Sequence, residues 1–211
     1  DLNEAPTDVT PNSFNLDENI DTGGGYSLGV LSSVDPDVDE VFSYSIQPGG
    51  HGLLFSIGGA ASDELWIDDG VLDFETSSSY SVNLRVTDGA SNTYDETLTV
   101  NVNDLNEAPT AITPTSFNIN ENVDTSSGTS VGTLSATDAD AGETFTYSIQ
   151  GGADQLQFSI GGALSDELIL TDGILDFESK SSYAVTVRVT DSFGNTYDEA
   201  ITVSVNDFNE A

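Results

Sequence analysis

The chain has 211 residues, with 37 acidic side chains against three Lys and Arg, and its formal net charge is −34 at pH 7. This charge excludes nucleic acid and anionic membrane surfaces as direct partners, because both require a basic patch. The absence of cysteine excludes disulfides, thiol catalysis and thiolate metal sites. Hydrophobic residues make up 36% of the chain, which indicates folded domains rather than a disordered acidic tail. No apolar run is long enough for direct membrane insertion.

One acidic segment recurs at a spacing of 103 residues. The letters DLNEAP stand at residues 1–6 and 104–109, and DFNEA stands at 207–211. A polar, proline-terminated segment at a fixed period indicates linkers between tandem domains. We therefore predict two domains, residues 1–106 and 107–211, each long enough to bury its own core. Because linker sequence stands at both ends, we expect the chain to be a fragment of a longer array, with targeting signals elsewhere.

Short apolar runs predict strands at residues 13–16, 27–33, 41–47, 54–57 and 64–67. The segments 80–86 and 97–102 alternate apolar with polar residues, which is typical of half-buried antiparallel strands. Both alternating segments recur in the second half, at 183–189 and 201–205. Residues 75–79 are long enough for one helical turn. About seven short strands in about 100 residues indicate an all-β chain of two tandem Greek-key β-sandwich domains.

Many acidic residues gather at strand ends and in loops. They are Glu18, Asp35, Asp37, Asp73, Glu75 and Asp88 in the first half, and Glu121, Asp138, Asp140, Asp176, Glu178 and Asp191 in the second. Asp-x-Asp and Asp-x-Glu in an extended segment place two carboxylates on the same side of the backbone. Carboxylate oxygens are the ligands that calcium prefers, at about 2.3–2.6 Å. With Asp104, Asn106 and Glu107, the central linker is therefore a predicted calcium site.

The order of these motifs resembles that of the cadherin repeat. The matching residues are Glu18-Asn19, Asp35-x-Asp37, Leu72-Asp73-Phe74-Glu75, Val86-Thr87-Asp88-Gly89 and the linker Asp104-x-Asn106-Glu107-x-Pro109, and the second half contains all five motifs in the same order. The linker is one residue shorter than the family pattern Asp-x-Asn-Asp-Asn-x-Pro. In this respect the chain is similar to the cadherin-like repeats of large bacterial surface and secreted proteins.

In the cadherin family, calcium ions lie between consecutive domains, so the resemblance implies a central site built by both repeats. Its ligands would be Glu18, Asp73, Glu75, Asp104, Asn106, Glu107, Asp138, Asp140 and Asp191. The resemblance also implies two terminal half-sites, which would be weaker. One comprises Asn3, Asp35, Asp37 and Asp88, and the other comprises Glu121, Asp176, Glu178, Asp207 and Asn209.

These observations favour a calcium-binding extender or adhesion module of a larger repetitive protein, located at the cell surface or secreted. Bound calcium would neutralise the clustered carboxylates and stiffen the joint between domains, because the site exists only in the folded, docked form. The expected partners are adjacent repeats of the same array. A polysaccharide and another copy of the chain are further candidate partners.

A calcium-dependent carbohydrate-binding module is the alternative hypothesis, with Trp66, Phe55 and Tyr26 as candidate sugar contacts. Phe55 recurs as Phe158, which fits a core position better. Enzymatic activity is not expected, because every acidic pair is duplicated and no Ser-His-Asp arrangement repeats. The single histidine, His51, corresponds to an aspartate in the second half. The acidic residues also have a structural alternative, a solvated face that keeps the protein soluble.

Overall fold

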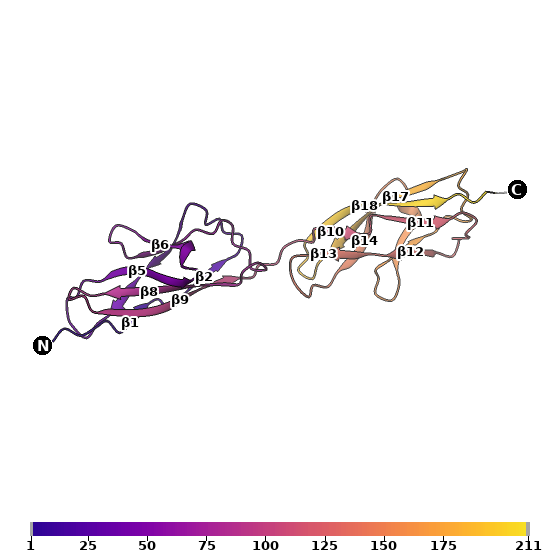
Figure 1. Cartoon of the computed structure of the whole chain (residues 1–211). Helices are drawn as coiled ribbons and strands as arrows, with labels where there is room; N and C mark the ends of the chain where they lie inside the picture. Colours follow the sequence, from indigo (N-terminus) through magenta and orange to yellow (C-terminus); the bar gives the residue numbers. More distant parts are fainter. Residues whose placement is uncertain (1, 210–211) are drawn as a thin grey trace. The chain divides into compact units, whose positions relative to one another are not determined.

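The computed structural model describes residues 2–209 and divides into two compact units, Asp1–Leu105 (unit 1) and Asn106–Ala211 (unit 2) (Figure 1). The boundary lies one residue ahead of the position expected from the repeat. Each unit has its own cluster of buried apolar side chains. Among the described residues, no helix is both long and apolar enough to cross a bilayer.

Unit 1 is a two-layer sandwich of short strands. Its described residues form β1 (Asp8–Thr10), β2 (Ser13–Asp17), β3 (Tyr26–Val30), β4 (Ser32–Val34), β5 (Ser43–Gly50), β6 (Phe55–Gly58), β7 (Glu64–Ile67), β8 (Ser79–Thr87) and β9 (Thr93–Asn103), with a 3-10 turn at Gly52–Leu54. One layer is the sheet β2-β9-β8-β5, and the other contains the sheet β3-β7-β6 and the pair β1-β4. Strand β2 pairs with β9 in parallel, whereas β8 pairs with β9 antiparallel.

Unit 2 repeats this architecture strand for strand. It contains β10 (Ala111–Thr113), β11 (Ser116–Asn120), β12 (Thr129–Thr133), β13 (Ser135–Thr137), β14 (Thr146–Gly151), β15 (Phe158–Gly161), β16 (Glu167–Leu170), β17 (Ser182–Thr190) and β18 (Thr196–Asn206), with a 3-10 turn at Gln155–Gln157. Its layers are β11-β18-β17-β14 and β12-β16-β15 with β10-β13. The prediction of an all-β chain with two tandem β-sandwiches is confirmed.

The alternating segments supply the core of each sandwich. Val82, Leu84 and Val86 of β8 are fully buried, while Asn83 and Arg85 between them face outward. Burying one such aliphatic side chain stabilises the fold by about 1.5–3 kcal/mol. The period-two pattern therefore sets which face of each strand meets the other layer, because a register slip of one residue would expose the whole apolar row.

The structure differs from the predicted elements in three places. The segment predicted as one strand at 27–33 is divided into β3 and β4 around buried Leu31, after a register shift between Ser27 and Gly29, which has a φ of +136°. Strand β1 was not predicted, because it has only three residues between two prolines. The single turn expected at residues 75–79 lies two residues earlier, where the Ser77 N–H donates to the Asp73 carbonyl at 2.9 Å.

Candidate metal centres

Each unit carries one acidic cluster at each of its ends. We call the cluster beside the ends of β2 and β9, or β11 and β18, the exit cluster. It contains Glu18, Asp73, Glu75 and Asp104 in unit 1, and Glu121, Asp176, Glu178 and Asp207 in unit 2. We call the opposite cluster the entry cluster. It contains Asn3, Asp35, Asp37 and Asp88 in unit 1, and Asn106, Glu107, Asp138, Asp140 and Asp191 in unit 2.

The parallel pairing of β2 with β9 positions the exit cluster of unit 1. Asp17 pairs with Asn103, so the residues that follow the two strands, Glu18 and Asp104, emerge at the same edge. Glu18 is only 3% exposed, and its carboxylate accepts the Phe74 N–H at 2.9 Å and the Leu105 N–H at 2.6 Å. One buried carboxylate thus ties the 73–75 loop to the segment that follows β9.

The carboxylates of the exit clusters lie close enough to share an ion. In unit 1, one oxygen of Glu75 lies within 4.8 Å of an oxygen of Glu18, and one lies within 4.8 Å of an oxygen of Asp104. In unit 2, Glu121, Asp176 and Glu178 each offer an oxygen within 4.8 Å of the other two. Two ligands of one calcium ion lie at most about 5 Å apart, since each is about 2.3–2.6 Å from the ion. The spacing therefore suits a shared cation.

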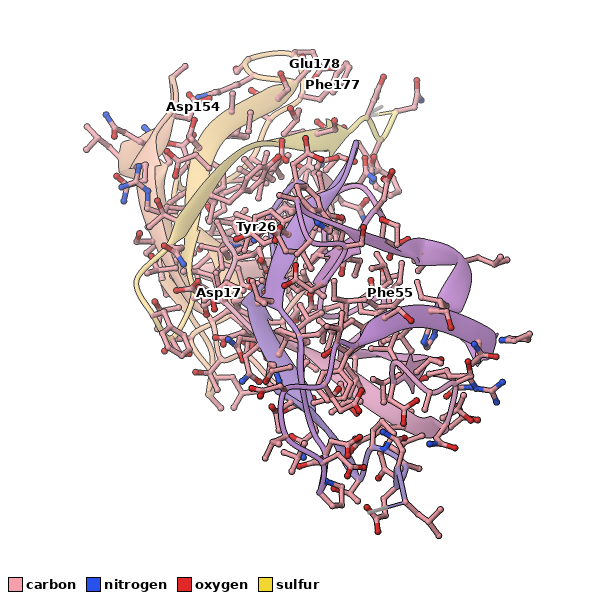
Figure 2. The ribbon with its side chains drawn as sticks, turned by 90° about the vertical axis from the view of Figure 1, so that its left-hand side faces the viewer. Asp17, Tyr26, Phe55, Asp154, Phe177 and Glu178 are labelled. Carbon is pink, nitrogen blue, oxygen red and sulfur yellow. The ribbon has the colours of Figure 1, made fainter. Side chains whose placement is uncertain are left out.

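The loop of unit 2 that carries Asp176 and Glu178 borders an open hollow of about 560 Å³. Figure 2 shows Phe177 and Glu178 next to one another in this loop, apart from Asp154. The Phe177 N–H donates to the buried Glu121 carboxylate at 3.0 Å, which repeats the Phe74–Glu18 bond of unit 1. Asp207 and Asn209, which follow β18, are exposed.

The first aspartate of each Asp-x-Glu motif also shapes its own loop. Asp73 accepts the Thr76 N–H at 2.9 Å and the Thr76 hydroxyl at 3.0 Å. These hydrogen bonds hold the pKa of Asp73 below its ordinary value, because they favour the charged form. Asp176 makes the same two contacts with Ser179, with the same effect on its pKa. Both aspartates are therefore charged and fixed in place.

The entry clusters tie the linker backbone to the Asp-x-Asp motif. In unit 1, the Glu4 N–H donates to Asp37 at 2.7 Å. In unit 2, the Glu107 N–H donates to Asp140 at 2.9 Å. The first aspartate of each motif accepts the N–H of the second, at 2.9 Å in unit 1 and 3.2 Å in unit 2. The same geometry is therefore built twice, 103 residues apart.

In each entry cluster, the first aspartate of the Asp-x-Asp motif has one carboxylate oxygen that is buried without a hydrogen-bond partner among the described residues. These atoms are Oδ2 of Asp35 and the equivalent Oδ2 of Asp138. Burial raises the pKa of Asp138 above its ordinary value, and the nearby Asp140, Asp191 and Glu143 raise it further. Burying an unsatisfied carboxylate oxygen among other acids is costly. A bound cation would satisfy this oxygen and remove the repulsion, so the donor set fits calcium.

The late aspartate of each repeat is buried, at 6% exposure for both Asp88 and Asp191. Burial acts to raise the pKa of Asp191, but hydrogen bonds from Asn106, Asn195 and Gly194 lower it below its ordinary value. The Asn106 amide donates to Asp191 at 2.9 Å. Asp191 is therefore held as an anion that also anchors the segment preceding β10.

Sequence reasoning missed two residues of each entry cluster. Asn92 donates to Asp88 at 2.9 Å and to the side-chain oxygen of Asn3 at 2.5 Å. Glu40 accepts the Asn3 amide at 2.7 Å and the Gly89 N–H at 3.1 Å. Their counterparts in unit 2 are Asn195 and Glu143, which bond the same segments. Both residues could have been identified from the sequence, because they recur at the 103-residue spacing.

Of the three aromatic residues predicted as sugar contacts, Phe55 lies in the core, whereas Trp66 and Tyr26 are partly exposed. Phe55 is 7% exposed and belongs to the core. The half-buried Trp66 packs onto Gly58, where an added Cβ would lie 2.8 Å from the indole Nε1. Tyr26 is 37% exposed.

Comparison with known proteins identifies the fold and the type of repeat. Residues 115–206 match the family model described as Cadherin domain. Cadherin EGF LAG seven-pass G-type receptor 2 of mouse and human is 28% identical over 98% of this chain, which spans 7% of those relatives. Protocadherin Fat 4 of mouse is 33% identical over 78% of this chain, which spans 3% of that relative.

Solved protocadherin structures have a similar fold. Human Protocadherin-24 EC1-2 superposes with a TM-score of 0.72 at 23% identity, covering 99% of this chain and all of that structure, and this likeness concerns the fold. PcdhgB3 EC1-4 has a TM-score of 0.71 at 25% identity and covers 97% of this chain and 50% of that one. The chain therefore consists of tandem cadherin-like repeats. The named relatives from mouse and human give no support to the expected bacterial type.

Proposed function

We propose that this chain is a calcium-binding extender or adhesion module of an extracellular or cell-surface protein. The exit cluster of unit 1 and the entry cluster of unit 2 both adjoin the linker at 104–107, and in this proposal they hold calcium together. The ligands are those predicted from the sequence, with Asn195 and Glu143 positioning the entry cluster. The buried, unsatisfied Oδ2 of Asp138 is the observation that carries the proposal.

Electrostatic repulsion makes the joint responsive to calcium. Two unit charges about 4 Å apart repel by about 4 kcal/mol at an effective dielectric of about 20. Without a cation, the acidic clusters on the two sides of the linker oppose docking. With calcium, ligands from both units are held by one set of ions, and the joint stiffens. Calcium binding then appears as added stability, because it favours the folded, docked form.

A thermal melt of the 211-residue chain in chelator, in calcium and in magnesium tests this proposal. We expect a calcium-specific rise in Tm, which Asp138→Asn and Asp104→Ala largely remove. Asp35→Asn is the matched comparison, because Asp35 has the geometry of Asp138 but belongs to the weaker half-site away from the linker. We expect it to remove less of the rise. Small-angle scattering on the same samples should show a longer, stiffer particle in calcium. Identical melts in calcium and chelator would contradict the proposal.

A second copy of the chain is a candidate partner. One similar structure, 25% identical with a TM-score of 0.69, is that of a Protocadherin gammaB7 EC3-6 cis-dimer. We infer that pairing of this chain, if it contributes to adhesion, depends on the calcium-stiffened form. Analytical ultracentrifugation in calcium and in chelator tests this inference. If the chain stayed monomeric at high concentration in both conditions, this inference would be contradicted.

A further inference from the structure

The outward face of β5, β8 and β9 in unit 1 contains a polar hollow that the metal clusters do not use. It has a volume of about 370 Å³, within the range of about 300–1,000 Å³ that is typical of small-ligand pockets. It is lined by Gln47, Pro48, Asn83, Leu84, Arg85, Asp95, Glu96 and Thr97. The Glu96 carboxylate accepts the Val9 N–H at 2.9 Å. The hollow lies where the β5–β8 register shifts between Gln47 and Gly50.

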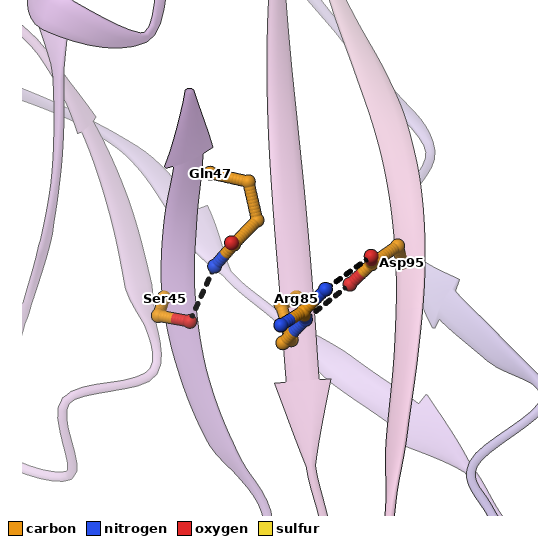
Figure 3. A network of polar contacts seen from close by, with 4 residues as sticks. All are labelled: Ser45, Gln47, Arg85 and Asp95. Atoms are coloured by element: carbon orange, nitrogen blue, oxygen red, sulfur yellow. Dashed lines mark hydrogen bonds and ion pairs between the residues drawn. The ribbon is translucent and has the colours of Figure 1, made fainter. Parts of the chain in front are cut away.

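Hydrogen bonds hold the polar groups of this hollow in place. Arg85 donates to both carboxylate oxygens of Asp95 at 2.6 Å, and Figure 3 shows this paired contact beside the bond from Gln47 to Ser45. The Thr97 hydroxyl donates to Asn83 at 2.8 Å, and the Asn83 amide donates to the Pro48 carbonyl at 3.2 Å. Each group keeps further lone pairs or N–H donors for a ligand.

The charge of this face differs from that of the rest of the chain. On the outward sides of β8 and β9, the charged side chains are Arg85 and Asp95, which neutralise one another. The other outward residues of these two strands are serine, threonine and asparagine. An anionic ligand would be repelled by a chain of net charge −34. A neutral ligand rich in hydroxyl groups is compatible with both the face and the chain.

An apolar surface adjoins the polar hollow. A neighbouring hollow of about 400 Å³ shares Gln47 and Pro48 with it and continues to Leu53, whose side chain is fully exposed. Glycine is required on this side, because an added Cβ at Gly49 would lie 2.8 Å from the Asn83 amide nitrogen, and the φ of Gly49 is +115°. Hydroxyl-binding groups thus stand next to an apolar strip, which suits the two kinds of surface on a sugar ring.

We propose that this hollow binds a neutral saccharide. Asn83, Arg85, Asp95 and Thr97 hydrogen-bond its hydroxyl groups, while Pro48 and Leu53 contact its C–H face. This site is independent of the proposed calcium joint, because all of its residues belong to unit 1 and none belongs to an acidic cluster. It does not include Trp66, Phe55 or Tyr26.

Unit 2 supplies a matched comparison. It keeps the Arg188–Asp198 pair at 2.7 and 2.8 Å, but Gly151, Thr186 and Ala200 replace Pro48, Asn83 and Thr97. Unit 2 thus retains the charged pair but lacks the counterparts of the Asn83 amide, the Pro48 ring and the Thr97 hydroxyl. We expect saccharide binding to unit 1 and not to unit 2.

Affinity gel electrophoresis and NMR titration of the 211-residue chain test this proposal, with dextran, a soluble β-1,3-glucan and a soluble xylan as neutral probes and alginate as an anionic one. We expect at least one neutral probe to retard the chain and to shift amide signals of β5 and β8. The double variant Asn83→Ala/Thr97→Ala should bind about tenfold more weakly, since two hydrogen bonds are lost. Thr186→Ala is the matched control and should bind as the wild type does.

Two further samples separate this site from the calcium joint. Retardation should be the same in chelator and in calcium, and Asp138→Asn should leave it unchanged. Melts of every variant confirm that it is folded, which is expected because Asn83 and Thr97 lie on the sheet surface. No retardation by any neutral probe would overturn the proposal. Retardation that survives the Asn83→Ala/Thr97→Ala double variant would overturn it too.

Discussion

Units 1 and 2 differ at the residue that precedes the 3-10 turn and contacts β8 in unit 1 or β17 in unit 2. In unit 1, His51 Nδ1 accepts the Ser81 N–H at 3.0 Å, and its ring meets the Tyr80 ring edge-on with centroids 5.4 Å apart. In unit 2, Asp154 takes the same position and accepts the Ala184 N–H at 2.8 Å. Two chemically different side chains therefore satisfy the same backbone donor.

The neighbouring residues change together with this acceptor. Lys180 of unit 2 forms an ion pair with Asp154, and its ammonium group lies 4.1 Å from the centroid of the Tyr183 ring. The corresponding position in unit 1 is Ser77, which carries no charge. The fold therefore has a hydrogen-bond acceptor at this point in both units, and the charged acceptor of unit 2 is paired with a lysine.

Both units keep a tyrosine at the centre of this region. Tyr183 donates its hydroxyl to Asp172 at 2.7 Å. Burial raises the pKa of Tyr80 to about 12, with a further contribution from Asp69, and burial raises the pKa of Tyr183 as well. The two tyrosines are therefore neutral hydrogen-bond donors at physiological pH. The two units therefore share the tyrosine, Tyr80 or Tyr183, and differ in the neighbouring acceptor, His51 or Asp154.

Truncating a core side chain should cause the largest loss of stability, and it tests whether the two units unfold independently. Leu65→Ala in unit 1 and Leu168→Ala in unit 2 each remove a fully buried side chain. Each should cost about 2–5 kcal/mol of unfolding free energy. In chelator, calorimetry should show one of two transitions moving down with each variant while the other stays. If both transitions moved down together in either variant, the two units would unfold as one, and their independence would be contradicted.

A smaller loss of stability should follow from removing the side chain that accepts the backbone N–H, Asp154 in unit 2 or His51 in unit 1. Asp154→Ala leaves the Ala184 N–H without its partner and Lys180 without its carboxylate, so we expect a loss of about 1–3 kcal/mol in unit 2. His51→Ala should cost unit 1 less, because no charged partner is left behind. The double variant His51→Asp/Ser77→Lys, which copies unit 2, should restore the stability of unit 1. Failure of this graft would show that more of the surroundings differs than these two positions.

Acid should remove the stability that the Asp154–Lys180 pair contributes to unit 2. The hydrogen bond from Lys180 lowers the pKa of Asp154 below its ordinary value. A depressed pKa contributes stability above the unfolded value, about 3.9 for aspartate, which is lost as pH falls through the folded value. The Tm difference between wild type and Asp154→Ala should therefore shrink as pH falls below about 4. A difference that stays constant from pH 7 to pH 2 would contradict this assignment.

The smallest effect is expected at the surface ion pairs that the units share. Arg85 and Arg188 form exposed bidentate pairs with Asp95 and Asp198. Exposed pairs contribute little to stability. Arg188→Ala should leave the Tm of unit 2 unchanged, and Arg85→Ala should do the same in unit 1 while weakening saccharide binding. A clear fall in Tm would give the pairs a structural role that their exposure does not predict.

The sequence alone determined the features that depend on local pattern and repetition. The alternation in residues 80–86 predicted which side chains of β8 are buried, because side chains on a strand point to opposite faces in turn. The 103-residue spacing predicted two domains of the same kind. It also singled out the acidic motifs, since Glu18 and Asp73 recur as Glu121 and Asp176.

How distant segments meet depends on the tertiary structure. The parallel pairing of β2 with β9 joins residues 86 positions apart and brings Glu18 beside the segment after β9, and no local pattern encodes that choice. The unsatisfied Oδ2 of Asp138 and the hollow at Asn83 likewise depend on burial and on long-range contacts. Sequence periodicity reports the face of a strand, whereas burial of a single oxygen depends on what the whole fold packs around it.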